Sequence, residues 1–331
     1  MALPSKLAGR LTLPLIAAPM FTVSSPELVI AACRAGVVGA FPTANCRTVE
    51  DLDAWLTSFR TSLADTDAPY CANLVIRRPD LAAHLDRLCA HGVELVITSV
   101  GSPAPVIGPL HAAGAAVFCD VSTVEHARKA IAAGVDGLVL LTAGAGGQTG
   151  SLNGLAFARA VRAFFDGPIV LAGGICDGAA LWAATAVGCD LGYMGTRFIA
   201  THESAAAEPY KQMLIDSSAD DVIVTDAFTG LPTSMLLPSL RAAGIDPRAM
   251  TRQESRESAS RIFDRDPPEP TQRRWRDLWS AGHAVGSVDA VMSVRDLVDQ
   301  TRRQFAAAAI ASAQSDWLGG CAPSDARVGR D

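Results

Sequence analysis

Eight short apolar segments recur roughly every 25 residues, and each is followed by a stretch with helical periodicity. They are apolar at consecutive positions, which is typical of strands covered on both faces in a parallel sheet. Glycine and polar signals gather at the C-terminal ends of these segments. They therefore favour a closed (β/α)8 TIM barrel over its rival, an open doubly wound sheet. The predicted strands are 14–20, 37–43, 70–76, 94–100, 115–121, 136–143, 168–174 and 191–196.

Helices are predicted between these strands, and several carry recognisable ends. Thr123 can cap the helix that follows it, and Gly134 can end that helix in a left-handed conformation. Asp177 can cap the helix after the seventh strand. The predicted helices are 26–35, 49–63, 80–91, 104–113, 123–133, 153–165 and 177–187.

The alternation stops near residue 200, which defines the expected domain organisation. Residues 1–199 and 287–313 are predicted to form the barrel, with a long amphipathic eighth helix in the second segment. Residues 200–286 are predicted to be a mainly helical insertion that caps the barrel mouth and contacts substrate. Residues 314–331 are predicted to be a disordered tail.

Composition and charge narrow the function classes. The net charge is −6 and no basic stripe carries interleaved aromatic residues, so nucleic acid is not an expected partner. No uncharged apolar run reaches the length of a membrane span. Eight cysteines lack metal-ligand or CxxC spacing, and no signal peptide precedes them, which predicts reduced thiols, no metal site and a cytoplasmic protein.

Two glycine signals predict a phosphate site at the ends of the seventh and eighth strands. Gly173 and Gly174 follow one strand, and Gly195 and Thr196 follow the next. Glycines leave backbone N–H groups accessible, and a helix N-terminus beyond them favours an anion. The alternative is that these glycines only permit tight turns from strand to helix.

Polar and small residues also end the first and third strands. Ala18, Pro19 and Met20 follow the first strand, and Asn73 interrupts an apolar run in the third. A buried asparagine requires hydrogen-bond partners. Asn73 therefore binds either the polar edge of a ring-shaped ligand or a neighbouring backbone group.

Several segments, taken in order from Pro14 to Val291, resemble the nitronate monooxygenases, formerly called 2-nitropropane dioxygenases. These segments are PLIAAPM, AACRAGVVGAFPT, CANL, AGVDGLVLLTAGAGGQTG, PIVLAGGICDG, GCDLGYMGTRFIATHES and WSAGHAVGSVDAV. The resemblance implies an FMN-dependent oxidoreductase that uses O2, with NAD(P)H as a further candidate partner, working as a monomer or homodimer. It also implies that FMN contacts Ala18, Pro19, Met20, Asn73, Gly147, Gly173, Gly174, Gly195 and Thr196.

Two departures from the family pattern concern catalysis. Many members have GGHxG, where the histidine is a base, but this chain has Gln148 at that position. A carboxamide cannot take up a proton at neutral pH, although it can donate a hydrogen bond to a substrate oxygen. Relatives often have SAGQ where this chain has His283. We therefore hypothesise that His283 supplies the missing titratable group.

A third departure lies on the fifth strand. Some members have a lysine near the N1–O2 edge of the flavin, and this chain has Asp120 at the matching position. A carboxylate would not stabilise an anionic reduced flavin. The redox properties of the family therefore do not transfer directly to this chain.

The sequence leaves other functions open. An NAD(P)H-dependent reductase of an activated C=C bond, such as that of an enoyl thioester, fits the same barrel. A flavin-free sugar-phosphate isomerase or aldolase also fits, but no lysine stands at a predicted strand end. A ligand-binding module without turnover is the fourth possibility. The remaining helix histidines, His84, His91, His111 and His126, are expected at the surface.

Overall fold

The computed structural model describes residues 5–228, 230–245 and 278–315. Its centre is a closed barrel of eight parallel strands, because β1 pairs with β2 on one side and with β9 on the other. Every predicted strand lies in this barrel, so the closed arrangement is confirmed and the open sheet is excluded. The strands are β1 (Leu15–Ala17), β2 (Val38–Pro42), β3 (Tyr70–Val75), β4 (Leu95–Ser99), β5 (Ala116–Val121), β6 (Gly137–Leu141), β8 (Ile169–Ala172) and β9 (Leu191–Met194).

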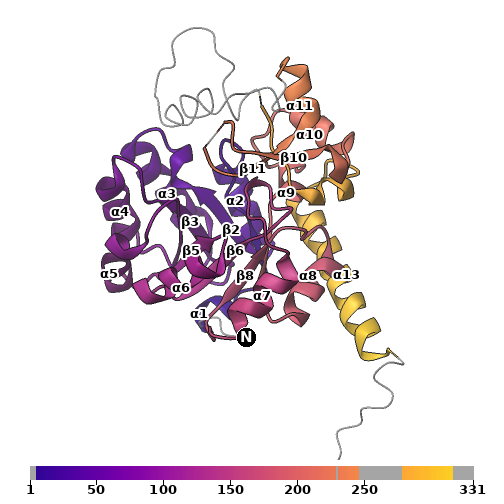
Figure 1. The fold of residues 1–331 in the computed structure, drawn as a ribbon. Helices are drawn as coiled ribbons and strands as arrows, with labels where there is room; N and C mark the ends of the chain where they lie inside the picture. Colours follow the sequence, from indigo (N-terminus) through magenta and orange to yellow (C-terminus); the bar gives the residue numbers. More distant parts are fainter. Residues whose placement is uncertain (1–4, 229, 246–277, 316–331) are drawn as a thin grey trace, which may run out of the picture.

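Helices surround the barrel in the order that the sequence predicted (Figure 1). Thr123 and Asp177 cap their helices through side-chain oxygens, and Gly134 adopts the left-handed conformation with φ of 97°. The helices are α1 (Ser5–Ala8), α2 (Pro26–Arg34), α3 (Val49–Ser62), α4 (Leu81–Ala90), α5 (Ala104–Ala112), α6 (Val124–Ala133), α7 (Gly154–Arg162) and α8 (Gly178–Ala186), with a 3-10 turn η1 (Thr43–Asn45).

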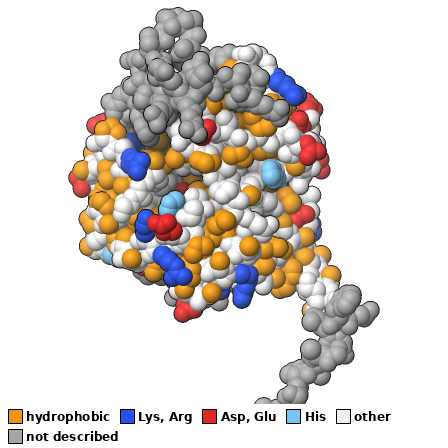
Figure 2. Space-filling model, in the orientation of Figure 1, with side chains coloured by type: hydrophobic (Ala, Val, Ile, Leu, Met, Phe, Trp, Pro, Cys, Tyr) orange, Lys and Arg blue, Asp and Glu red, His pale blue; other side chains and the backbone are white. Residues whose placement is uncertain are grey.

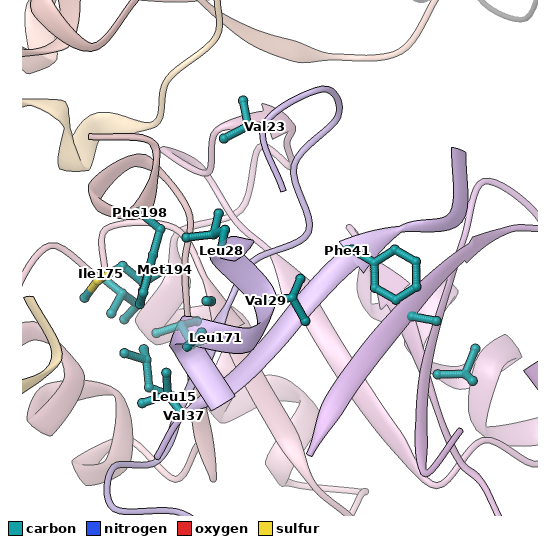
Figure 3. Packing of buried hydrophobic residues seen from close by; sticks show 14 of the residues in the cluster. Leu15, Val23, Leu28, Val29, Val37, Phe41, Leu171, Ile175, Met194 and Phe198 are labelled. Atoms are coloured by element: carbon teal, nitrogen blue, oxygen red, sulfur yellow. The ribbon is translucent and has the colours of Figure 1, made fainter. Parts of the chain in front are cut away.

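The strands carry two apolar layers, because their side chains alternate between the helices and the barrel axis. The outer layer packs strands against helices; Figure 3 shows Leu28 of α2 beside Met194 and Phe198. The inner layer fills the barrel with side chains such as Ile97 and Phe118. The barrel is therefore closed by a packed interior and can bind ligands only at its ends.

The segment after β9 adds structure at one end of the barrel (Figure 1). It contains helices, as predicted, and also two strands that pair with the short strand β7 in the order β10–β11–β7. The sequence analysis did not anticipate this small sheet. The elements are α9 (Thr196–Ile199), α10 (Glu208–Ile215), η2 (Ala219–Asp221), β10 (Val222–Thr225), β11 (Thr233–Leu236), α11 (Leu237–Ala242) and η3 (His283–Ser287), with β7 at Gly147–Gln148.

The chain returns to the barrel through α13 (Val294–Ala313), the predicted eighth helix. The helix starts seven residues later than the prediction of 287, because Ser293 caps it and accepts a hydrogen bond from the Asp296 amide. It packs on α8, where Trp182 and Phe305 meet edge to face with their ring centroids 5.5 Å apart. The predicted disordered tail, 314–331, lies outside the described residues apart from its first two positions.

Candidate active site at the barrel mouth

Backbone amides at the ends of β8 and β9 are available to a ligand. The amides of Gly174, Gly195 and Thr196 donate no hydrogen bond to any described residue. Gly174 has φ of 73°, and a Cβ atom added there would meet nothing within 4 Å, so the turn faces open space. Gly174 and Gly195 therefore leave donors where an anion can approach. Gly173 packs closely instead, because a Cβ atom added there would lie 2.4 Å from Thr142 Oγ1.

The start of α8 is not part of this anion site, although the sequence analysis had included a helix N-terminus in it. The Asp177 carboxylate accepts the Ala180 amide, and the Gly178 amide donates to Gln304 Oε1 of α13. A Cβ atom at Gly178 would lie 2.1 Å from the Thr301 carbonyl oxygen. Gly178 is thus explained by helix packing, and the amides of Gly178 and Ala180 already have partners within the chain.

The predicted residues of the first strand lie beside these amides. The Ala18 amide donates to the Met194 carbonyl, which joins the end of β1 to the end of β9. A Cβ atom at Gly195 would stand 3.5 Å from both Ala18 Cβ and Met20 Sδ. Ala18, Pro19, Met20 and Gly195 therefore form one continuous rim of the mouth.

Four polar side chains form a layer on the inner face of the barrel near its mouth, which we call the inner polar layer: Asn73 of β3, Ser99 of β4, Asp120 of β5 and Tyr193 of β9. Asn73 accepts a hydrogen bond from Ser99 Oγ at 3.2 Å. Asp120 Oδ1 and the Tyr193 hydroxyl are buried and form no hydrogen bond with the described chain. Asn73, which the sequence predicts to bind a ligand, thus lies in the same layer as two polar groups that have no hydrogen-bond partner among the described residues.

Burial determines the charge states in the inner polar layer. It raises the pKa of Asp120 to about 7, because the carboxylate loses its hydration there. Burial also raises the pKa of Tyr193 well above its usual value, and the nearby Asp120 carboxylate adds to the effect. Tyr193 is therefore a neutral hydroxyl, whereas Asp120 gains and loses its proton near neutral pH.

The glycine loop 143–148 lies directly against residues 280–283, which come from the far side of the insertion. The His283 amide donates to the Gly144 carbonyl at 2.9 Å, and the Gly147 amide donates to Ser280 Oγ at 2.9 Å. A Cβ atom at Gly282 would lie 2.5 Å from the Gly144 oxygen and 2.7 Å from the Gly146 nitrogen. Several of these glycines thus have a structural reason that the sequence analysis did not give: they let two backbones touch. We call this the loop contact.

Both departures from the family pattern lie in the segments that form the loop contact. Gln148 is half-buried in β7, opposite Thr233 of β11. The His283 ring lies over Gly144, where an added Cβ atom would be 2.8 Å from Nδ1. Neither side chain forms a hydrogen bond with the described residues. The Gly282 amide donates to Thr196 Oγ1 at 3.0 Å, which ties the loop contact to the predicted phosphate site.

Sequence reasoning missed Ser280 and Tyr210, which hold the loop contact together. Ser280 Oγ donates to the Ser234 carbonyl in β11, and the Tyr210 hydroxyl of α10 donates to the Ser280 carbonyl. Tyr210 is also stacked on Trp279, with the ring planes 8° apart. A serine and two aromatic residues in an insertion give no periodic signal, so only the tertiary structure reveals this role.

The expectation that the helix histidines lie at the surface is wrong for His84. Its side chain is fully buried and lies 2.7 Å from the Arg78 guanidinium, next to Asp80. Burial and then the Arg78 charge lower the pKa of His84 to about 4, so it is neutral. Arg78 also donates to Thr43 Oγ1 at 2.8 Å, so this cluster fixes the turn that follows β2.

Other site classes find no support among the described residues. No three His, Cys, Asp or Glu side chains converge there as a metal site. No helix in the described ranges has the length and hydropathy needed to cross a membrane. Figure 2 shows acidic, basic and apolar side chains interspersed on the visible face rather than a single charged patch. The barrel mouth remains the candidate site.

Two solved structures share this architecture. FabK from Thermotoga maritima superposes with a TM-score of 0.80 at 24% identity, covering 96% of this chain and 97% of that chain, which shows the shared fold. A nitroalkane oxidase from Streptomyces ansochromogenes superposes with a TM-score of 0.76 at 26% identity, covering 93% and 100%. Both similarities extend over nearly the whole chain, insertion included.

Curated relatives fall into two activity classes. A 5-hydroxy-7a-methyl-1-oxo-octahydro-1H-indene-4-carboxyl-CoA dehydrogenase of Rhodococcus jostii is 29% identical over 67% of this chain. A nitronate monooxygenase of Paraburkholderia phytofirmans is 28% identical over 71% of this chain and 76% of its own length. The chain spans 62% of the length of the first of these.

Both relatives carry names of redox enzymes, a dehydrogenase and a monooxygenase. The profile of the nitronate monooxygenase family matches residues 81–302. That range contains the glycine loop, both predicted phosphate-binding turns and the return of the chain through His283. The chain belongs to the nitronate monooxygenase family.

Proposed function

We propose that this protein is an FMN-dependent oxidoreductase that oxidises an alkyl nitronate with O2. The observation that carries the proposal is that the loop contact, with Gln148 and His283, joins the turns whose amides are free at Gly195 and Thr196. A phosphate fits free amides, and a flat ring with polar edges fits buried groups that lack partners. Membership of the nitronate monooxygenase family supports the same cofactor and substrate class.

The division of labour around the cofactor follows from the position of each group. Free amides after β8 and β9 would hold the phosphate, and the rim with Asn73 would line the ring. We infer that residues 1–199 and 287–313 carry the cofactor and that residues 200–286 contribute the substrate side. The proposed FMN contacts are Ala18, Pro19, Met20, Asn73, Gly147, Gly173, Gly174, Gly195 and Thr196.

Gln148 and His283 are the proposed catalytic residues. FMN, when bound, accepts electrons from the substrate and passes them to O2. The Gln148 carboxamide can donate a hydrogen bond to a nitronate oxygen but cannot remove a proton from carbon. The His283 imidazole can accept that proton, and its ring lies over the same glycine loop. A preformed nitronate therefore needs Gln148, whereas a neutral nitroalkane also needs His283.

A second candidate function keeps FMN and changes the substrate. It is NAD(P)H-dependent reduction, or the reverse dehydrogenation, of a C–C bond activated by a thioester. Gln148 favours this candidate, because the position that carries a base in many family members has none here. Similarity to carboxyl-CoA dehydrogenases supports a thioester as its substrate.

Colour and anaerobic reduction separate these functions. A yellow protein that releases FMN on heating supports both FMN-dependent functions. A colourless protein would contradict both and favour a flavin-free isomerase or aldolase, or a ligand-binding module without turnover. Anaerobic bleaching by propionate-3-nitronate or an alkyl nitronate, without NAD(P)H, is the result expected for the first function. Bleaching by NADH, NADPH or a saturated acyl-CoA, with no response to nitronate, would replace the first function with the second.

A further inference from the structure

Asp120 and Tyr193 are half-buried residues, and each has a buried oxygen that takes part in none of the contacts above. They lie on β5 and β9, on the inner face of the barrel near its mouth. Asp120 Oδ1 and the Tyr193 hydroxyl have no hydrogen-bond partner among the described residues. A buried oxygen without a partner costs about 1–3 kcal/mol, and more when it is charged. Two such groups from different strands, close enough for the Asp120 charge to raise the pKa of Tyr193, indicate that a polar ligand satisfies them.

No described cation compensates the Asp120 carboxylate. The titratable groups that face it are Cys71 of β3 and Tyr193 of β9, whose pKa values are raised by burial first and by the Asp120 charge in addition. Cys119, its neighbour on β5, lies on the opposite face of the strand. The neighbouring strands β4 and β6 present Ile97, Ser99 and Val139, none of which ionises. A carboxyl group in this environment keeps its proton up to about pH 7, and the protonated form can donate a hydrogen bond to an acceptor above it.

We propose that Asp120 and Tyr193 contact the polar edge of the cofactor ring and that Asp120 gives a proton to the ring when the ring is reduced. This proposal rests on the proposed function, since it requires FMN at the barrel mouth. The Tyr193 hydroxyl donates a hydrogen bond to the same edge. Asp120 thus replaces the positive charge with which other enzymes neutralise a reduced flavin, because it neutralises the ring by protonating it.

Protons and electrons balance in this step. The substrate supplies two electrons and becomes oxidised, and the proton of a neutral nitroalkane goes to His283. The ring gains the two electrons, one proton from solvent and one proton from the Asp120 carboxyl, so that the reduced ring is neutral and Asp120 is a carboxylate. Above pH 7 Asp120 is mostly ionised before the reduction and takes its proton from solvent, which makes the net uptake two protons and two electrons per ring. An ionised Asp120 beside an anionic ring would instead place two like charges together.

The test is the pH dependence of the reduction potential of the FMN-loaded enzyme between pH 7 and 8.5. With two protons per two electrons, the reduction equilibrium changes a hundredfold per pH unit, or about 60 mV. In Asp120→Asn one proton remains, and the change is tenfold per pH unit, or about 30 mV. Asp65→Asn is the matched control, since Asp65 is exposed in the loop before β3 at the opposite end of the barrel, and it should retain the wild-type slope.

Tyr193→Phe provides an independent readout, the affinity for FMN measured by fluorescence quenching. Loss of one hydrogen bond should weaken binding by about three- to tenfold without changing the slope. Equal slopes in wild type and Asp120→Asn would overturn the proton transfer, and unchanged affinity in Tyr193→Phe would overturn the contact. If Asp120→Asn takes up no FMN, the slope of the wild-type protein alone decides. A slope of two protons per two electrons supports the proton transfer, and a slope of one proton overturns it. Failure of the wild-type protein to bind FMN would instead reject the proposed function.

Discussion

The two sides of the barrel mouth are built in different ways. The inner polar layer consists of single residues on β3, β4, β5 and β9, and each faces inward because strand side chains alternate. The loop contact joins residues 143–148 to residues 280–283, more than 130 positions away. It consists mainly of backbone atoms, with Gly144, Gly146 and Gly282 at the points of closest approach.

The two sides should therefore differ in how well they tolerate substitutions. A side chain in the inner polar layer can change without moving its strand, because ladder hydrogen bonds hold the backbone on both sides. In the loop contact a single added methyl group would collide with backbone. We therefore expect substitutions in the layer to alter proton and ligand chemistry, and substitutions in the contact to alter the geometry of Gln148 and His283.

The largest predicted effect is on the loop contact side. His283→Ala should lower turnover of a neutral nitroalkane by about 10²- to 10⁴-fold, the usual contribution of a general base. Turnover of the corresponding preformed nitronate should change little, because that substrate has already lost its proton. Steady-state rates with both substrates at equal pH measure the difference.

Gln148→His sharpens the same comparison. If a base is what position 148 lacks, adding the family's histidine to His283→Ala should restore nitroalkane turnover in the double variant. Equal rates for wild type and His283→Ala on the neutral substrate would show that His283 is not the base.

The second prediction concerns the inner polar layer and the stability of the FMN-free protein. Since burial raises the pKa of Asp120 from 3.8 to about 7, the folded state binds this proton more tightly than the unfolded state. Stability should therefore fall as pH rises from about 4 to about 7 and then remain low. At about 1.4 kcal/mol per pKa unit, the full loss is on the order of 4 kcal/mol.

Urea unfolding of wild type and Asp120→Asn at several pH values measures this effect. Asp120→Asn should remove most of this loss, since an amide does not ionise. A parallel pH dependence in the two proteins would contradict the assignment of the shift to Asp120. Asp65→Asn serves as a control with an exposed carboxylate.

The contrast between the two sides also explains what the sequence could predict. The strands, their order, closure of the barrel and the ends of its helices follow from local periodicity and caps such as Thr123 and Asp177. The meeting of the segments that carry Gln148 and His283 was expected only through the family resemblance. The sheet of β10, β11 and β7 was not expected, because its strands are only two to four residues long and pair within a loop-rich insertion.

Burial of individual polar residues was the other limit of the sequence analysis. His84 has the same helical context as His91 and His111, but its neighbours in space, Arg78 and Asp80, enclose it. Likewise the sequence shows Asp120 as a departure from the family, but not that its Oδ1 is buried with no hydrogen-bond partner among the described residues. Such facts depend on contacts between distant segments.

The third prediction tests the precision of the loop contact. Gly282→Ala should destabilise the protein by about 1–3 kcal/mol, as overpacking does, and lower activity by displacing Gln148 and His283 together. Gly108→Ala is the control, because Gly108 lies within α5 with nothing within 4 Å of an added Cβ atom. That change should stabilise the helix by up to about 1 kcal/mol. A neutral Gly282→Ala would mean that the two segments can separate without cost.

The smallest predicted effect has opposite signs in the free and the loaded protein. Without FMN the Tyr193 hydroxyl is buried and has no described partner, so Tyr193→Phe should raise the free energy of unfolding by about 1 kcal/mol. With saturating FMN this gain should disappear, because the wild-type hydroxyl then donates a hydrogen bond that phenylalanine lacks. Thermal melts of both proteins, with and without FMN, measure the two differences. A stabilisation that persists in the loaded protein would show that the inner polar layer does not touch the ligand, and only the loop contact would remain as the wall that faces it.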